Sequence, residues 1–198
     1  MKLTLQQGKY LVKLARSSIA FHFENKQPKP EGKLKEKLGV FVTLKTTEDE
    51  LRGCIGFITP NFPLEQAILK AAASAAFNDP RFSPLKKEEL DEIKIEISIL
   101  TKPELIKVNS PEDYPNKIKI GEDGLIIDAE GFSGLLLPQV AVEHKLSAKQ
   151  FLDNLCLKAG LLIDTWKLGD CKIYKFQAQI FSEGSPNGAI SEIKQKSL

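Results

Sequence analysis

The hexapeptide Leu51-Arg52-Gly53-Cys54-Ile55-Gly56 contains the residue types that point most directly to chemistry. As a β-strand it would place Arg52, Cys54 and Gly56 on one face, with the α-carbons of Arg52 and Cys54 about 6.6 Å apart. A guanidinium beside a thiol favours the thiolate, and Gly56 would leave bare backbone for a ligand or another chain to approach. The pattern predicts a nucleophilic or redox cysteine. A buried cysteine on a core strand, with glycines for packing or a bulge, is the alternative.

The use of arginine adds a second indication. The chain has 25 lysines but only three arginines, Arg16, Arg52 and Arg81. Where lysine carries nearly all positive charge, a rare arginine indicates a need for its planar, bidentate fork. We predict that Arg81 lies near Cys54 around one concavity, where it and Arg52 bind an anionic group. The alternative for Arg81 is a structural ion pair with Asp79 or a contact with a helix C-terminus.

The two histidines differ in their surroundings. His144 follows a short predicted helix that starts at Pro138, and it is a candidate general base for Cys54, because a triad is defined by geometry and not by chain order. Packing or capping of that helix is the alternative. His22, beside two phenylalanines, is predicted to be structural or solvent-facing. The candidate catalytic residues are therefore Cys54 and His144, and the candidate substrate-binding residues are Arg52, Gly53, Gly56 and Arg81.

The other cysteines are not predicted to react. Cys156 shares a helical stripe with apolar neighbours and should be almost fully buried, and Cys171 begins a strand. The paired spacing that zinc requires is missing, so we expect no metal site. Walker and dinucleotide-binding spacings are also missing, and the sequence does not identify a cofactor.

The scaffold follows from hydrophobic periodicity. Capping boxes at Thr4 and Ser147 predict helix starts, and strict alternation over 93–99 gives the clearest strand. The expected elements are a helix from Thr4 to Ser18, strands over 39–46 and 51–58, an alanine-rich helix over 64–75, a strand over 93–99, a three-strand meander over 118–137, a helix over 147–159 and a strand over 171–181. Hairpins alternate with helices, which predicts an α+β fold with a mixed, largely antiparallel sheet flanked by helices. We expect a single domain over 1–198, with a frayed polar tail over 184–198.

Charge and hydropathy exclude several classes. The net charge is +2, with basic and acidic residues interleaved, so a nucleic-acid partner is not expected. Apolar runs stop well short of the roughly 20 residues of a membrane span. The N-terminus resembles no export signal, which predicts a cytoplasmic protein with reduced thiols. The sequence leaves the oligomeric state open, a homo-oligomer included.

Several segments, in order along nearly the whole chain, resemble the AMMECR-domain family. They are the hexapeptide 51–56, Asp79-Pro80-Arg81-Phe82 with Pro84-Leu85, and the segments 96–100, 124–125, 134–141 and 156–161. The resemblance implies an α+β fold in two unequal lobes, with the hexapeptide and the Asp-Pro-Arg-Phe loop near a cleft between them. It also implies the company of a Memo-type protein and a radical S-adenosylmethionine enzyme. It supplies no catalytic residues.

Two functions remain open at this point. One is a cleft enzyme, or an enzyme component, in a modification pathway, which would use Cys54 with Arg52 and Arg81 as anion-binding groups. The other is a non-catalytic binding module or adaptor, whose motif face docks a protein or nucleic-acid partner while Cys54 packs. The reactivity of the Cys54 thiol distinguishes them.

Overall fold

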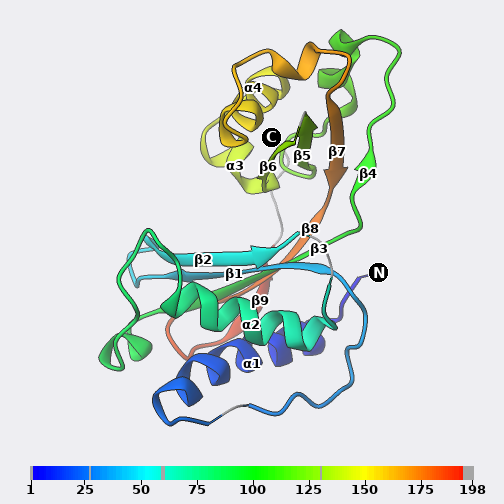
Figure 1. Ribbon diagram of the computed structural model, residues 1–198. Coiled ribbons are helices and arrows are strands. Elements are labelled where there is room, and N and C mark those ends of the chain that lie inside the picture. The colour runs from blue at the N-terminus through cyan, green and yellow to red at the C-terminus, as the bar shows by residue number, and fades with distance from the viewer. Residues whose placement is uncertain (1, 27, 59–60, 130, 194–198) are drawn as a thin grey trace. The chain divides into compact units, whose positions relative to one another are not determined.

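A computed structural model of the chain describes residues 2–26, 28–58, 61–129 and 131–193 (Figure 1). It has an α+β fold in which the chain forms two compact units. Unit 1 contains the described residues up to Leu100 together with Gln179–Ile193, and unit 2 is Thr101–Ala178. Each unit has its own sheet and its own hydrophobic core, and each is described by itself. The α+β fold class predicted from the sequence is confirmed, and its strands divide between two sheets, one in each unit.

Unit 1 packs two helices against one face of a five-stranded sheet (Figure 1). Its elements are α1 (Leu5–Phe23), β1 (Gly39–Lys45), β2 (Leu51–Phe57), α2 (Leu64–Phe77), the 3-10 helix η1 (Glu88–Asp91), β3 (Lys94–Leu100), β8 (Ala178–Glu183) and β9 (Ile190–Ile193). The strand order is β2-β1-β3-β8-β9, so β2, which carries the hexapeptide, lies at an edge. β1 pairs antiparallel with both β2 and β3.

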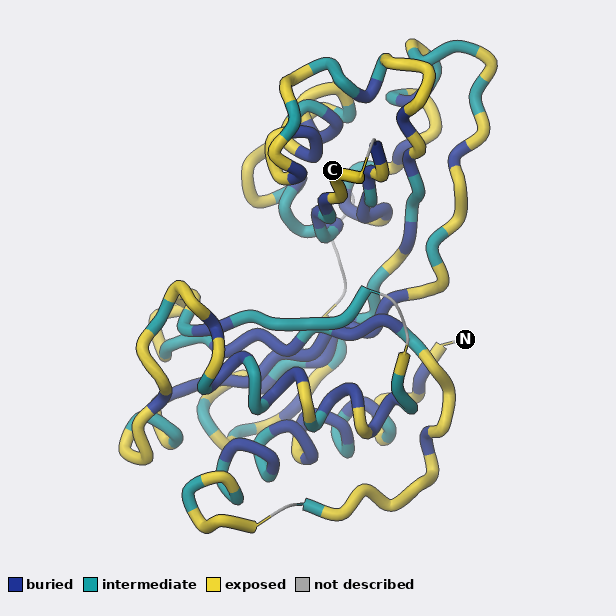
Figure 2. Tube along the Cα trace, viewed as in Figure 1, coloured by how far each residue is buried: buried dark blue, intermediate teal, exposed yellow. Residues whose placement is uncertain are grey.

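Alternation along β1 and β3 divides the residues of this sheet between its two faces. Buried aliphatic residues of both strands belong to the core that α1 and α2 cover, as the dark-blue segments of Figure 2 show. They are Val40, Val42, Leu44, Ile95, Ile97 and Ile99. The residues between them on the opposite face are largely polar, and they include Thr43, Lys45, Glu96 and Ser98. The strand predicted over 93–99 is confirmed as β3.

Unit 2 has a four-stranded sheet of order β4-β7-β5-β6. Its elements are β4 (Glu104–Leu105), η2 (Pro111–Lys117), β5 (Gly124–Ala129), β6 (Phe132–Leu136), α3 (Pro138–Glu143), α4 (Ala148–Lys158), η3 (Thr165–Lys167) and β7 (Lys172–Phe176). The α4 stripe lies in the core of this unit, and Cys156 is fully buried as predicted. Both predicted capping boxes, Thr4–Gln7 and Ser147–Gln150, are present.

Three predicted elements differ from the structure. The meander over 118–137 contains only β5 and β6, because the chain before them forms a turn in which the Asp123 carboxylate accepts the Lys119 N–H. The strand over 171–181 is divided between β7 and β8 at Gln177, whose backbone bonds with Thr101 instead. The tail predicted to fray contains β9, which pairs with β8, whereas residues 194–198 lie outside the described part. None of the helices described is both long and apolar enough to cross a membrane.

Candidate functional site

The hexapeptide strand β2 lies at a sheet edge, where backbone groups normally lack partners. At Cys54 both groups are satisfied by the loop that follows α2. The Cys54 N–H donates to Asp79 Oδ2 at 2.8 Å, and Arg81 Nη2 donates to the Cys54 carbonyl at 3.1 Å. One carboxylate and one guanidinium thus take the place of a neighbouring strand.

Asp79 and Arg81 also bind each other through a bidentate pair. Arg81 Nε donates to Asp79 Oδ1 at 2.9 Å and Nη2 donates to Oδ2 at 2.7 Å, while the Arg81 backbone N–H reaches Oδ1 at 3.1 Å. The hydrogen bond from the Arg81 side chain, aided by the N–H groups of Cys54 and Arg81, holds the Asp79 pKa well below its usual range despite burial. The predicted proximity of Arg81 to Cys54 is confirmed, and so is the alternative that Arg81 pairs with Asp79.

Arg52 is bound by a different part of the same loop. The register of β1 and β2 shifts so that Lys45 faces Leu51, and a bulge at Arg52 breaks the strict alternation that the sequence prediction assumed. Arg52 Nε donates to Glu89 Oε1 at 2.7 Å, and Nη2 donates to the Ser83 carbonyl at 3.1 Å. Its pairing with Glu89 lowers the pKa of that carboxyl. The guanidinium is therefore committed to Glu89 rather than to the thiol.

Phe82 lies near both guanidiniums. The Cζ atoms of Arg52 and Arg81 are 5.9 Å and 5.5 Å from the centre of its ring, within the range of cation–π attraction. We call the group of Arg52, Asp79, Arg81, Phe82 and Glu89 around Cys54 the edge latch. In the described part of the chain Arg52 Nη1 is the one nitrogen of the latch that is buried without a hydrogen-bond partner.

The Cys54 thiol is partly buried and accepts a hydrogen bond from Thr43 Oγ1 at 3.3 Å. Burial raises its pKa, and Asp79 and Glu96 raise it further, against the opposing effects of Thr43 and Arg81. From the sequence alone, the neighbouring Arg52 was expected to lower this pKa instead. At neutral pH the thiol is therefore protonated, which is the weakly nucleophilic form.

A row of polar residues crosses the sheet beside the thiol, and these residues were not predicted from the sequence to belong to the site. Cys54 on β2 faces Thr43 on β1, and Thr43 faces Glu96 on β3. Glu96 in turn pairs with Lys45 at 3.0 Å. The alternation that includes Glu96 was visible in the sequence, but its proximity to Cys54 depends on the strand order. Glu96 is thus committed to an ion pair with Lys45, and it acts on the thiol only through its charge, which raises the pKa of Cys54.

The two hexapeptide glycines make room for the protein's own backbone. A Cβ on Gly53 would lie 2.2 Å from the carbonyl oxygen of Ala75 on α2, and one on Gly56 would lie 2.2 Å from that of Val40. Close packing of helix and strands therefore accounts for both glycines without a ligand. Their substrate-binding role stays a prediction.

His144 is exposed and caps the C-terminus of α3, with its backbone N–H donating to Val140. It belongs to unit 2 and Cys54 to unit 1, so its role as a general base stays a prediction. Across the residues described, no group of three or more His, Cys, Asp or Glu side chains is arranged to hold a metal ion.

Comparisons with known proteins agree on one family. The AMMECR1 family model matches residues 12–181. The chain is 49% identical to protein MK0488 of Methanopyrus kandleri, over 96% of this chain and 95% of that protein. It is 51% identical to protein MJ0810 of Methanocaldococcus jannaschii, over 97% and 98%. The crystal structure of the uncharacterized protein PH0010 from Pyrococcus horikoshii matches with a TM-score of 0.92 at 46% identity, covering all of both chains.

Proposed function

This chain belongs to the AMMECR1 family, and we propose that it is a non-catalytic binding module that docks a protein partner through the edge latch. The docking region is the exposed side of the latch. The observation that carries this proposal is that the reactive groups of the motif are bonded within the protein itself.

A cysteine enzyme would need groups that the latch does not leave free. A nucleophilic cysteine requires a thiolate, whereas the Cys54 thiol is held protonated by burial. An anion site requires uncompensated positive charge, whereas the guanidiniums of Arg52 and Arg81 each bind a carboxylate. These pairings favour the binding module over the cleft enzyme.

The exposed side of the latch has the character of an interface. We define the latch surface as the exposed residues Leu51, Pro80, Arg81, Ser83 and Pro84. Leu51 is a large apolar side chain that remains 43% exposed, and the Arg81 side chain is half exposed. Arginine is enriched at binding hot spots, and here Asp79 already holds its guanidinium in place. Such preorganisation lowers the entropic cost of binding.

A protein suits this surface better than a nucleic acid. The net charge of +2 provides no broad basic footprint, and the arginine charges are compensated by Asp79 and Glu89. Among protein partners we propose the Memo-type protein, whose company the family resemblance implies. The radical S-adenosylmethionine enzyme is the second partner to test.

Leu51 and Leu5 offer a matched pair for testing this surface. Both leucines are 43% exposed in unit 1, but only Leu51 belongs to the latch surface. We expect Leu51→Glu to weaken binding to the purified Memo-type protein at least tenfold, or about 1.4 kcal/mol, because a charge replaces an apolar contact. Leu5→Glu should bind as the unaltered chain does. Isothermal titration calorimetry measures both affinities.

The possible outcomes distinguish an error in the proposed partner from an error in the proposed docking surface. If the unaltered chain binds neither the Memo-type protein nor the radical enzyme, the proposed partners are wrong. If binding occurs and Leu51→Glu retains full affinity, the latch surface is not the docking site.

A further inference from the structure

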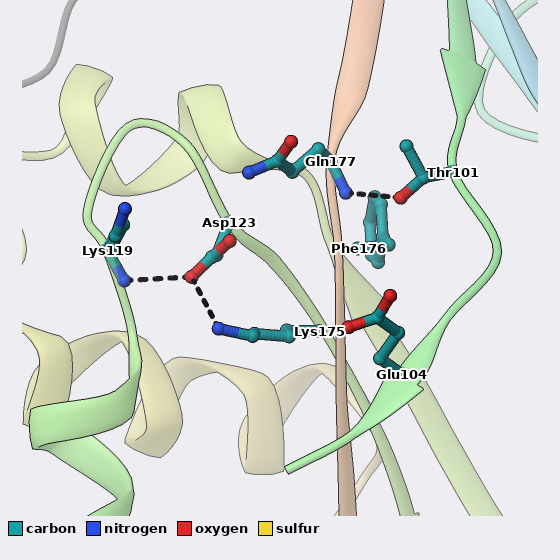
Figure 3. A pocket seen from close by; sticks show the side chains of 7 residues that line it. All are labelled: Thr101, Glu104, Lys119, Asp123, Lys175, Phe176 and Gln177. Carbon is teal, nitrogen blue, oxygen red and sulfur yellow. Dashed lines mark hydrogen bonds and ion pairs between the residues drawn. The ribbon is translucent and has the colours of Figure 1, made fainter. Parts of the chain in front are cut away.

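Unit 2 contains a cavity of about 280 Å³ that does not involve the motif residues (Figure 3). It lies between the ends of β4 and β7 and the turn that precedes β5. Its polar lining consists of Thr101, Glu104, Lys119, Asp123, Lys175 and Gln177. The buried ring of Phe176 supplies an apolar wall, and Gly124 leaves room for that ring, since a Cβ there would lie 2.4 Å from it. The volume is near the lower end for small-molecule sites, so a ligand must be small.

Asp123 is the buried polar group of this cavity, with only 2% of its surface exposed. The turn fixes it, because its backbone N–H donates to the Lys119 carbonyl and its Oδ2 accepts the Lys119 N–H at 3.0 Å. The Lys175 ammonium lies 3.7 Å from the same oxygen. Both dashed lines from Asp123 in Figure 3 thus end at Oδ2. Oδ1 accepts no hydrogen bond from the described residues and is not among their buried unpaired atoms, so this oxygen remains open to the cavity.

The charges around the cavity do not balance. Glu104 faces Lys175 across β4 and β7, yet within the described chain it forms no ion pair with Lys175 or any other residue. The Lys175 ammonium instead lies nearer Asp123 and donates to the Lys117 carbonyl at 3.3 Å. Lys119 is paired with Glu122, at 3.5 Å. With Lys119 paired to Glu122 outside the lining, the Lys175 ammonium is left to offset two carboxylates, Asp123 and Glu104, and the group of five charges carries a net negative charge.

We propose that this cavity binds a small ligand that carries a primary ammonium group. An ammonium has three N–H donors and no acceptor. The cavity offers three acceptors that no donor of the described chain satisfies, namely Asp123 Oδ1, the Glu104 carboxylate and the Gln177 side-chain oxygen. A cation also compensates the excess negative charge. A ligand whose charge is negative would meet Asp123 and Glu104 and is disfavoured.

The test uses two probes of the same shape and different charge. Glycinamide carries an ammonium at pH 6, below the pKa of about 7.7–8.0 of an α-amino group, and propionamide replaces that ammonium with a methyl group. We expect glycinamide to cause saturable shifts of the backbone amide signals of Asp123, Lys175 and Gln177 in ¹H–¹⁵N spectra of the full chain. Propionamide should shift none of them.

Glu104→Gln is expected to keep the fold, because Glu104 is exposed and the substitution removes only its charge. It should weaken glycinamide binding at least threefold, and the control Glu143→Gln, at an exposed carboxylate outside the cavity lining, should leave it unchanged. Equal shifts with propionamide would overturn the proposal. So would glycinamide shifts that lie elsewhere in the chain, their absence, or an affinity that Glu104→Gln does not alter.

Discussion

Replacing Asp79 by alanine is expected to lower the free energy of unfolding by about 3 kcal/mol, at the low end of what removing one partner of a buried ion pair costs. The carboxylate is buried and accepts hydrogen bonds from the Cys54 N–H and from the backbone and side chain of Arg81. Its loss leaves the Cys54 N–H unpaired, whereas the half-exposed Arg81 regains water, which limits the cost. Urea denaturation measures the change.

Asp91→Ala is the matched control, because Asp91 is exposed on η1 and, within the described residues, its side chain accepts one hydrogen bond, from exposed Asn187. It should change the stability by less than about 0.5 kcal/mol. A loss at Asp79 no larger than the loss at Asp91 would mean that the latch contributes nothing to the fold.

The contribution of Asp79 should also depend on pH. Its pKa in the folded protein lies below the unfolded value of about 3.9, so its stabilising effect is fully present above that value. The effect is lost as the pH falls through the folded pKa. The difference in stability between the unaltered chain and Asp79→Asn should therefore shrink as the pH is lowered below about 4, and a difference that stays constant would contradict the assignment.

Gly53→Ala should have the second large effect, a loss of about 2–3 kcal/mol of stability from overpacking. The added methyl group would lie 2.2 Å from the backbone carbonyl oxygen of Ala75, and it would be attached directly to the backbone of β2, which packs against α2. Neither element can move without disturbing the core of unit 1. Urea denaturation curves of Gly53→Ala and of the control Gly169→Ala measure the two losses of stability.

Gly169→Ala serves as the control, because a Cβ at Gly169 would meet no atom within 4 Å. It should leave stability nearly unchanged. Equal losses at the two positions would show that α2 does not pack against β2 as closely as the structure indicates.

The elements that could be predicted are those specified by local patterns. The capping boxes and stripes of α1 and α4 and the alternation of β3 depend on residues a few positions apart. The division of the last predicted strand at Gln177 could not be predicted in this way. It depends on hydrogen bonds with Thr101, which is 76 positions away, and the alternating pattern continues across the break.

In the candidate site, too, local features could be predicted from the sequence and long-range pairings could not. The rarity of arginine correctly indicated positions that need a bidentate fork, since each arginine binds a carboxylate of the chain. The pairs are Arg16–Glu183, Arg52–Glu89 and Arg81–Asp79. Glu89 and Glu183 lie 37 and 167 positions from their arginines, so only the fold reveals them. At Cys54 the nearby charge is visible in the sequence, but the burial of the thiol, which dominates its pKa, is not.

Alkylation of Cys54 by iodoacetamide in the native protein tests most directly whether the motif is a structural latch or a reactive site. The rate at pH 7, followed by mass spectrometry of the Cys54 peptide, should be lower than that of a free cysteine, whose pKa is about 8.5, because burial keeps the thiol protonated. In Arg52→Leu, at urea concentrations where the protein remains folded, the rate should not fall further, since the Arg52 guanidinium is bound to Glu89. A Cys54 that reacts faster than free cysteine, and slows when Arg52 is replaced, would contradict the latch and restore the cysteine enzyme.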